Sequence, residues 1–513
     1  MQRDIEITLA PEELHQEAII KIKLAEALKI NTSSLTSYQI LKRSIDARSR
    51  KVIYRLMIKA FINEEKPNEH HLVNYPNVKD GKQVIIIGAG PAGLFAALQC
   101  IEIGLKPIVL ERGKDVKQRR RDLAAINKEG IVNTESNYCY GEGGAGTYSD
   151  GKLYTRSNKR GDINKVLQVF VDHGATQDIL MDARPHIGTN KLPHIITAIK
   201  ETILNAGGEV HFDQKVTDFI IDFDAVKGVV VANSETFTAD AVILATGHSA
   251  RDIYQLLQAK GILVEAKPFA LGVRIEHPQA IIDAAQYHCD IRSEFLPPAY
   301  YSLVEQVGSR GVFSFCMCPG GIIAPCATHD NEIVVNGWSP SKRNNPFANS
   351  GTVVQITLDD VKGDDPLRMM NFQAEVEKTA FKYGGGNLVA PGQRMIDFVE
   401  GRFSNDLPKN SYLPGTKSAM LKEILPDFVA SALKDALPFF GKKMKGYFTN
   451  EAILVGVESR SSSPVRIPRD KETYQHPQIK GLFPCAEGAG YAGGIVSAAI
   501  DGINCANAVL KIA

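Results

Sequence analysis

The sequence predicts an α/β protein of three parts, and three observations support this prediction. The chain has 513 residues, which is more than one hydrophobic core usually supports. From residue 83 onward, continuously apolar strands alternate with helical segments, as in a parallel sheet that is covered on both faces. A glycine-rich turn joins the first of these strands, residues 84–87, to the first helix, as in Rossmann-type domains.

The N-terminal part, residues 1–80, is expected to form a small α+β module. A short strand comes first, and residues 11–29 have the apolar spacing of a helix. Residues 38–62 read as two strands joined by a turn near Ala47–Lys51. Residues 63–82 are polar and read as a linker.

The two remaining parts are expected to share the rest of the chain. A discontinuous Rossmann-type domain is predicted over residues 81–265 and 446–513. An α+β domain that faces the substrate is predicted as an insertion over residues 266–445. This middle segment mixes short strands and helices and contains no second nucleotide fingerprint.

Composition excludes several classes of protein. A net charge of +1 gives no electrostatic reason to expect a nucleic-acid or membrane partner. The first ten residues lack the basic and apolar regions of a signal peptide, and no uncharged apolar run reaches about 18 residues. The eight cysteines show no disulfide or zinc spacing, so we expect reduced thiols, a cytoplasmic location and no metal site.

The glycine-rich turn has the GxGxxG pattern of a dinucleotide-binding fingerprint. Gly88 permits the tight turn, Gly90 lets the backbone approach a pyrophosphate, and Gly93 lets helix and strand pack closely. The following helix begins at Pro91–Ala92 and presents unpaired N–H groups to the phosphates. Glu111 ends the next strand, where a carboxylate can accept both ribose hydroxyls.

Three further features favour FAD over NAD. The tripeptide Ala245–Thr246–Gly247 closes a later apolar strand, a glycine-rich loop precedes the C-terminal helix, and large insertions interrupt the nucleotide-binding fold. This order resembles the glutathione-reductase/p-hydroxybenzoate-hydroxylase superfamily of FAD enzymes. The resemblance implies that Glu487 binds the ribityl chain and that the next helix begins near the flavin, at Gly493, Gly494 and Ile495. The chain departs from the usual Gly-Asp pair by having Ala486 before Glu487.

Longer motifs narrow the resemblance. The segments 140–153, 267–279, 313–321, 345–351 and 458–467 are similar to those of a bacterial family of uncharacterised FAD-dependent dehydrogenases. The resemblance implies that the loop GEGGAG lies along the FAD and that backbone at one strand start holds the adenine. For Arg112, contact with the adenosine and simple solvation both remain open. The implied loop residues are Gly143, Gly144 and Gly146, and the implied adenine contact is the backbone of Val216.

Arg460 is the candidate for a catalytic role, because a cation beside the ring can stabilise the reduced flavin. The alternative is a structural ion pair, with Glu458 as its partner. Lys267, Arg274 and His277 are substrate-side candidates. His248 is expected to be structural.

Three neighbouring arginines, Arg119–Arg121, are expected to lie on a solvated helix face. Cys316 and Cys318 are two residues apart on an expected strand, a spacing that is poorly suited to a disulfide. Redox-active cysteines are therefore not expected.

The sequence thus favours an FAD-dependent oxidoreductase of the dehydrogenase type, which passes a hydride between a small-molecule substrate and the flavin. NAD(P)H remains possible as a transient reductant. A second hypothesis is a redox sensor or scaffold with a structural FAD, whose N-terminal module recruits a partner. A third is an NAD-dependent enzyme without flavin. The substrate and the oligomeric state stay open.

Overall fold

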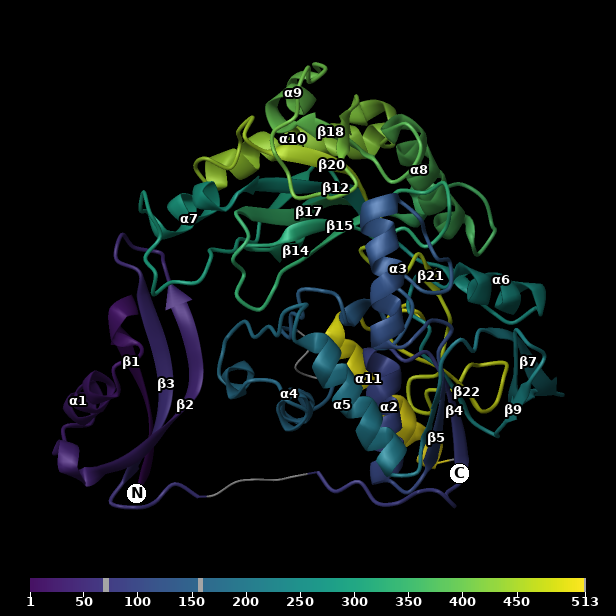
Figure 1. The fold of residues 1–513 in the computed structure, drawn as a ribbon, viewed down its shortest axis with the longest axis horizontal. Coiled ribbons are helices and arrows are strands. Elements are labelled where there is room, and N and C mark those ends of the chain that lie inside the picture. Colours follow the sequence, from purple (N-terminus) through teal and green to yellow (C-terminus); the bar gives the residue numbers. More distant parts are fainter. Residues whose placement is uncertain (68–72, 156–159, 512–513) are drawn as a thin grey trace.

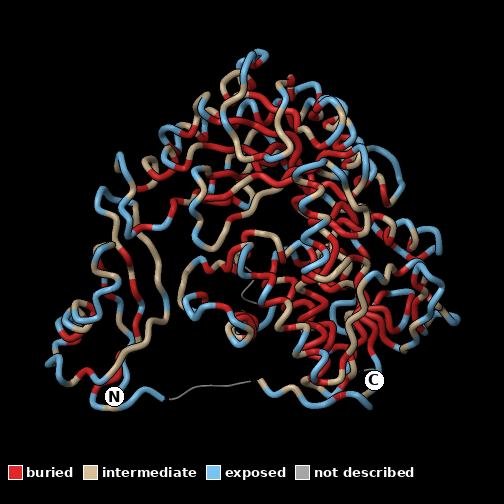
Figure 2. The backbone as a smooth tube through the Cα atoms, viewed as in Figure 1, coloured by how far each residue is buried: buried red, intermediate tan, exposed pale blue. Residues whose placement is uncertain are grey.

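The computed structural model describes residues 1–67, 73–155 and 160–511. Three parts are visible in Figure 1: the N-terminal module on the left, the nucleotide-binding domain at the lower right, and a cap above it. Buried residues are concentrated in the interiors of the two larger parts (Figure 2).

The N-terminal module is a three-stranded sheet with one helix packed against it. The strands have the order β1-β3-β2 and are antiparallel. Leu24 on the helix and Leu56 on the central strand are fully buried, as expected for an apolar helix face on a sheet. The elements are β1 (Gln2–Leu9), the 3₁₀-helices η1 (Pro11–Glu13) and η2 (Thr32–Ser34), α1 (Glu17–Leu28), β2 (Leu35–Asp46) and β3 (Ile53–Ile62). The predicted hairpin is confirmed, and only the second part of the predicted helix is α-helical.

The nucleotide-binding domain has a five-stranded parallel sheet of order β22-β10-β4-β5-β6. Alternate residues of β4 point to opposite faces: Ile86 packs with α2, α5 and α11, whereas Ile85 packs with α6 and a small antiparallel sheet. Burial on both faces explains the continuously apolar strands. The strands are β4 (Gln83–Ile87), β5 (Lys106–Leu110), β6 (Glu209–His211), β10 (Val242–Leu244) and β22 (Leu482–Pro484).

The other elements of this domain cover the sheet or connect it to the cap. The helices are α2 (Pro91–Glu102), α3 (Val116–Glu129), η3 (Gly144–Gly146), α4 (Ile163–Asp172), η4 (Gln177–Leu180), α5 (Leu192–Asn205), α6 (Arg251–Ala259) and α11 (Ile495–Leu510). The small antiparallel sheet contains β7 (Val216–Asp222), β8 (Ala225–Val231) and β9 (Thr236–Thr238), and β11 (Glu265–Ala266) pairs with β21 (Val465–Arg466).

The cap is built on a seven-stranded sheet of order β13-β14-β17-β12-β20-β18-β19. Its strands are β12 (Phe269–Pro278), β13 (Val304–Val307), β14 (Arg310–Cys318), β17 (Phe347–Ile356), β18 (Ala390–Arg394), β19 (Thr416–Ser418) and β20 (Ile453–Glu458). The remaining elements are α7 (Gln279–Tyr287), the paired strands β15 (Ile322–Pro325) and β16 (Val335–Trp338), η5 (Leu358–Asp360), α8 (Arg368–Gly384), α9 (Met395–Glu400), η6 (Leu421–Glu423) and α10 (Asp427–Lys443).

The cap sheet extends beyond the range 266–445 that the sequence suggested. Strand β20 follows residue 446 in the chain but pairs with β12 and β18 near the middle of the cap sheet. Its residues are all buried, so pattern alone gives no sign of which sheet it joins. Contacts with the neighbouring strands β12 and β18 decide which sheet β20 joins.

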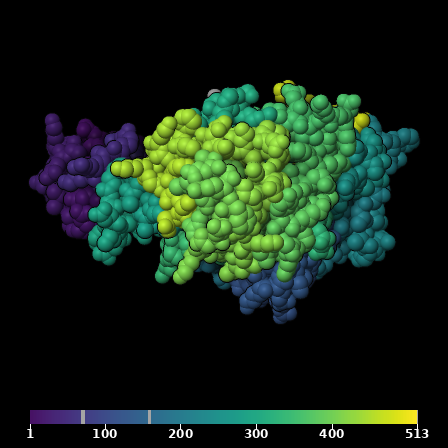
Figure 3. All heavy atoms as spheres, turned by 90° about the horizontal axis from the view of Figure 1, so that it is seen from above, coloured from purple at the N-terminus to yellow at the C-terminus, as the bar shows by residue number. Residues whose placement is uncertain are grey.

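The N-terminal module projects from one side of the molecule (Figure 3). It contacts the nucleotide-binding domain through Arg43, whose side chain pairs with Asp182 at 2.6 Å and whose backbone N–H donates to Met181. It contacts the cap through Tyr54, which donates to the carbonyl of Phe295. Among the described residues, no helix combines the length and apolar character needed to cross a bilayer.

Candidate active site

The turn between β4 and α2 shows why each glycine of the fingerprint is needed. Gly88 has φ +105°, and a Cβ there would lie 2.5 Å from the carbonyl oxygen of Ala245. A Cβ on Gly93 would lie 1.9 Å from the carbonyl oxygen of Gly88. A Cβ on Gly90 would meet only Gly144 Cα, at 3.9 Å. Gly88 and Gly93 therefore hold the turn together, whereas Gly90 leaves room beside it.

Glu111 is buried at the end of β5 and receives three backbone N–H groups. Ala89 donates to Oε2 at 2.8 Å, and Gly113 and Gly141 donate to Oε1 at 2.9 Å each. The carboxylate thereby fixes the fingerprint turn against the GEGGAG loop. Each carboxylate oxygen accepts more than one hydrogen bond, so capacity for a ribose hydroxyl remains on Oε2.

The prediction that Arg119 lies on a solvated helix face is wrong. Arg119 is fully buried, while its neighbours Arg120 and Arg121 are exposed. Its guanidinium donates at 2.8–3.0 Å to four backbone carbonyls of the segment that carries the GEGGAG loop: those of Asn137, Tyr138, Glu142 and Gly144. Nothing in the sequence shows which arginine is buried, because three adjacent arginines on one helix differ only in the direction in which they point.

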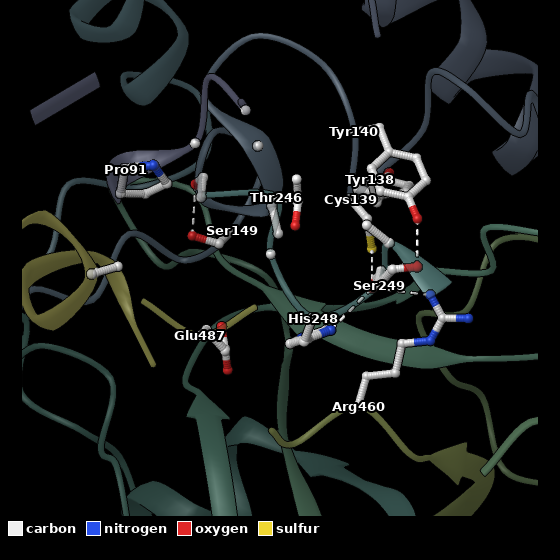
Figure 4. Close-up of a pocket in the computed structure, with 18 of the residues that line it drawn as sticks. Pro91, Tyr138, Cys139, Tyr140, Ser149, Thr246, His248, Ser249, Arg460 and Glu487 are labelled. Carbon is white, nitrogen blue, oxygen red and sulfur yellow. Dashed lines mark hydrogen bonds between the residues drawn. The ribbon is translucent and has the colours of Figure 1, made fainter. Parts of the chain in front are cut away.

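A cavity lies between the nucleotide-binding domain and the cap (Figure 4). Most of the predicted cofactor-binding residues line it: Gly88, Gly90, Pro91, Ala92, Glu111, Arg112, Gly144, Gly146, Val216, Ala245, Thr246, Gly247, Glu487, Gly494 and Ile495. Gly93, Gly143 and Gly493 do not line it. Gly93 faces the turn, Gly143 approaches Thr147 and Ile196, and Gly493 approaches Glu487.

The cavity wall suits a dinucleotide. Helix α2 begins at Pro91, and its N-cap Gly90 has φ −75° and ψ −177°. The unpaired N–H groups of its first turn therefore lie next to the glycine-lined turn. Thr246 Oγ1 is buried and has no hydrogen-bond partner among the described residues, so it suits a polar group of a ligand. The space beside Gly90 is the space that a pyrophosphate needs. These residues fit FAD.

Arg112 is neither simply solvated nor unpaired. Its guanidinium lies 4.3 Å from the centre of the Tyr140 ring and pairs with Glu135 at 2.6 Å and with Asp252 at 2.9 Å. Although burial lowers the pKa of Arg112, Tyr140 and Asp252 raise it above its ordinary value. This arrangement presents a fixed cationic plane to the cavity, where an adenosine could stack.

Glu487 follows Ala486, a residue with φ +56° in the left-handed region that favours glycine. The departure from Gly-Asp therefore keeps the backbone conformation in which glycine is usual. Burial raises the pKa of Glu487 to about 7, and the cation of Lys267 offsets this only in part. Lys267, a substrate-side candidate, does not line the cavity, and its ammonium donates to the carbonyls of Pro268 and Ser463.

Arg460 lines the cavity and is held by carboxylates, but its partner is not Glu458. It contacts Glu377 at 3.1 Å and Glu332 at 3.5 Å, and it donates to the hydroxyl of Ser249 at 3.1 Å. Arg251 pairs with the same two carboxylates at 2.7 Å each. Two arginines and two glutamates thus join the start of α6 to the cap.

Arg274 and His277 lie outside the cavity wall. Arg274 is fully buried and pairs with Glu458 at 3.0 Å, which explains why Glu458 is not the partner of Arg460. His277 lies in the cap core, 4.5 Å from the ring of Tyr447. His248 does line the cavity, and burial lowers its pKa to about 4, so it is neutral near pH 7.

The two strand cysteines face different surroundings because β14 is not regular. A bulge lies between Phe315 and Cys318, and Cys316 has φ +44°. Cys316 consequently lines the cavity, whereas Cys318 is fully buried. The prediction treated the strand as flat, and a single bulge changes which side chain faces the site.

One group of three buried potential metal ligands occurs among the described residues: Cys485, Asp501 and Cys505. Arg469 donates to both oxygens of Asp501 at 2.7 and 2.8 Å, and Ala486 N–H donates to one of them. The carboxylate is therefore already engaged by a cation.

Sequence reasoning missed several residues of the cap-side wall, among them Asp150, Lys152 and Trp338. Asp150 and Lys152 lie within the motif 140–153, which was assigned to the cofactor through its glycines alone. Trp338 comes from β16 and had no distinguishing signal in the sequence.

Three family models match parts of the chain. Residues 268–461 match a family described as FAD-dependent protein, C-terminal domain-like. Residues 83–119 match an FAD binding domain, and residues 1–61 match a domain of unknown function, DUF8436. The three matches fall on the cap, the fingerprint turn and the N-terminal module.

Individual proteins and solved structures are also similar to this chain. A digeranylgeranylglycerophospholipid reductase of Methanosarcina mazei is 24% identical over 247 residues, covering 45% of this chain and 54% of that protein. The crystal structure of glycine oxidase from Geobacillus kaustophilus is 12% identical with a TM-score of 0.35, covering 84% of this chain and 95% of that one. An uncharacterized protein of Clostridium beijerinckii is 40% identical and covers 96% of each chain. The chain therefore belongs to the same family as the Clostridium beijerinckii protein, and its cofactor is FAD.

Proposed function

We propose that this chain is an FAD-dependent oxidoreductase of the dehydrogenase type, which transfers a hydride between a small-molecule substrate and the flavin. The observation that carries the proposal is the composition of one cavity. The fingerprint turn and Glu487 form one wall of it, and cap residues such as Cys316 and Trp338 form another. A cofactor bound along the first wall therefore faces a second wall where a small molecule fits.

The chain's own residues supply binding and orientation. The start of α2 and the turn at Gly90 would hold the pyrophosphate, Glu111 a ribose, and Glu487 the ribityl chain. When bound, FAD supplies a ring that accepts or donates a hydride. A substrate held against the cap-side wall, which includes Cys316 and Trp338, would face a cofactor held by these residues.

Arg460 supports the proposal as a cation beside the cofactor. Its charge is fixed by Glu377 and Glu332, so it is already oriented before a ligand binds. We also infer membership of the glutathione-reductase/p-hydroxybenzoate-hydroxylase superfamily, and we keep NAD(P)H as a candidate reductant that visits the flavin without a domain of its own.

The test is reduction of the bound flavin. Purified protein should be yellow, absorb near about 450 nm, and release FAD on denaturation. Candidate metabolites and NAD(P)H are then added without oxygen, and loss of the flavin absorbance is followed. Fast bleaching by one compound supports the oxidoreductase. Retained FAD that no compound reduces would instead favour a structural or sensing flavin. Release of NAD or FMN in place of FAD would overturn the proposed FAD-dependent reaction.

A further inference from the structure

The charged side chains of the cavity wall are not equally well paired. Three of the four lysines and arginines that line it have a carboxylate within 3.1 Å: Arg112 has Glu135 at 2.6 Å, Lys215 has Glu135 at 2.8 Å, and Arg460 has Glu377 at 3.1 Å. The fourth is Lys152. Among the described residues, its nearest carboxylate oxygen is that of Asp150, at 3.9 Å.

The carboxylate of Asp150 is shared, and Lys152 is the more distant of its two cations. Arg343 donates to Asp150 Oδ2 at 2.9 Å. Burial raises the pKa of Asp150, but Arg343 and Lys152 outweigh burial and hold the value at about 2, so Asp150 is ionised. One carboxylate therefore faces two cations, which leaves one positive charge unmatched at this part of the wall.

Lys152 is held in place by the backbone around it. Leu153 N–H donates to Pro185 O at 2.9 Å, Ile187 N–H donates to Gly151 O at 3.1 Å, and Lys152 forms a β-bridge with His186. Its ammonium lies 3.5 Å from Cys318 Sγ, which places it against the cap. About 32% of its side-chain surface is open, and the side chain lines the cavity.

We propose that Lys152 binds the anionic group of a substrate that carries one negative charge, most simply a carboxylate. The inference deepens the proposed function and rests on it, because it names the substrate class of the same cavity. An ammonium that lacks a close carboxylate gains a charge-assisted hydrogen bond when a substrate carboxylate enters. A substrate with two negative charges would leave one of them unpaired in the cavity.

A competing role for Lys152 is to bind the cofactor's phosphates. Helix α2 and the turn at Gly90 already provide an anion site with N–H donors, and Gly146 is the loop residue that approaches Pro91 there. Lys152 lies beyond that part of the loop and contacts Cys318 of the cap instead. Retention of FAD by a Lys152 variant separates the two roles.

The experiment compares carboxylates with their neutral amides. The FAD-loaded protein is titrated by calorimetry with butyrate and butyramide, and with benzoate and benzamide, at constant ionic strength. The wild type should bind at least one carboxylate better than its amide. Lys152→Met should lower the affinity for that carboxylate about ten- to a hundredfold, leave the affinity for the amide unchanged and keep FAD bound. Lys152→Arg should retain most of the preference.

Lys342→Met is the matched control, because Lys342 is exposed, lies outside the cavity wall and carries the same charge. It should leave both affinities unchanged. Equal carboxylate binding by wild type and Lys152→Met overturns the inference, as does a wild type that prefers neither carboxylate. Loss of FAD from Lys152→Met assigns the lysine to the cofactor and also overturns it. Calorimetry measures binding and needs no reduction of the flavin. A flavin that no metabolite reduces would therefore overturn the proposed oxidoreductase, while the preference for carboxylate over amide could still be measured.

Discussion

Replacing Arg119 with methionine tests how the GEGGAG loop is held. Methionine keeps much of the side-chain length but donates no hydrogen bond. Four carbonyl acceptors, at 2.8–3.0 Å in the wild type, then lose their donor inside the protein. Gly144, the last of these, lines the cavity, so this part of the cavity wall loses its support.

The expected cost follows from these contacts. A buried acceptor that loses its partner costs about 1–3 kcal/mol, so four give an upper limit of about 12 kcal/mol. Part of this free energy is regained in the variant, because the buried charge of Arg119 is itself costly, as the lowering of its pKa by burial indicates. Removing one partner of a buried charged network typically costs about 3–5 kcal/mol. For a domain of this size that corresponds to roughly 6–20 °C in melting temperature.

The assay is thermal melting of the FAD-free protein together with the FAD content after purification. Arg120→Met serves as the control, because Arg120 is adjacent but exposed and should change the free energy of unfolding by less than about 0.5 kcal/mol. If Arg119→Met melts with the wild type and retains full FAD, the loop does not depend on this guanidinium and the reasoning fails.

Substitutions at four further positions test the site. Gly90→Val should abolish FAD retention with little change in the melting temperature of the FAD-free protein, because a Cβ at this position meets only Gly144. Gly93→Ala should instead lower that melting temperature, because its Cβ would lie 1.9 Å from the carbonyl oxygen of Gly88. Full FAD occupancy in Gly90→Val would contradict this reasoning. Glu487 holds its proton in the folded state up to about pH 7 but releases it near pH 4.5 when unfolded, so stability falls as pH rises through that window. Glu487→Gln should equal the wild type near pH 4.5 and exceed it above about pH 7 in FAD-free melting curves, and parallel curves at all pH values would refute the shift. Arg460→Ala should lower the flavin midpoint potential by some tens of millivolts, since about 30 mV corresponds to about 1.4 kcal/mol, with partial recovery in Arg460→Lys. An unchanged midpoint with FAD bound would leave Arg460 a purely structural role.

The parts of the site that lie close together in sequence were predictable. Gly88, Gly90 and Gly93 sit between one strand and one helix, and Glu111 ends the next strand along the chain. Their roles depend on local geometry, namely a positive φ, a close approach and a helix start, and each of these leaves a residue-type signal. The β-hairpin of the N-terminal module and the parallel strands were predictable for the same reason.

Long-range pairing was not predictable in this way. Arg460 has Glu377 and Glu332 as partners rather than the nearby Glu458, because Glu458 is taken by Arg274 from a neighbouring strand. An ion pair depends on distances between elements that sequence spacing does not contain. The same limit applies to β20, which is equally apolar in either domain and joins the cap sheet by pairing with its strands.

The sequence by itself determined the fold class and the fingerprint turn, because hydrophobic period and glycine positions are local properties of the chain. The choice of FAD came from the resemblance that the order of its motifs carries. Only the tertiary structure decided which of three adjacent arginines is buried and which of two cysteines faces the cavity. It also decided that Lys152 is the cation of the cavity wall without a close carboxylate among the described residues. The physical reason is that burial and charge pairing are set by what other segments bring to a side chain, and those segments are distant in sequence.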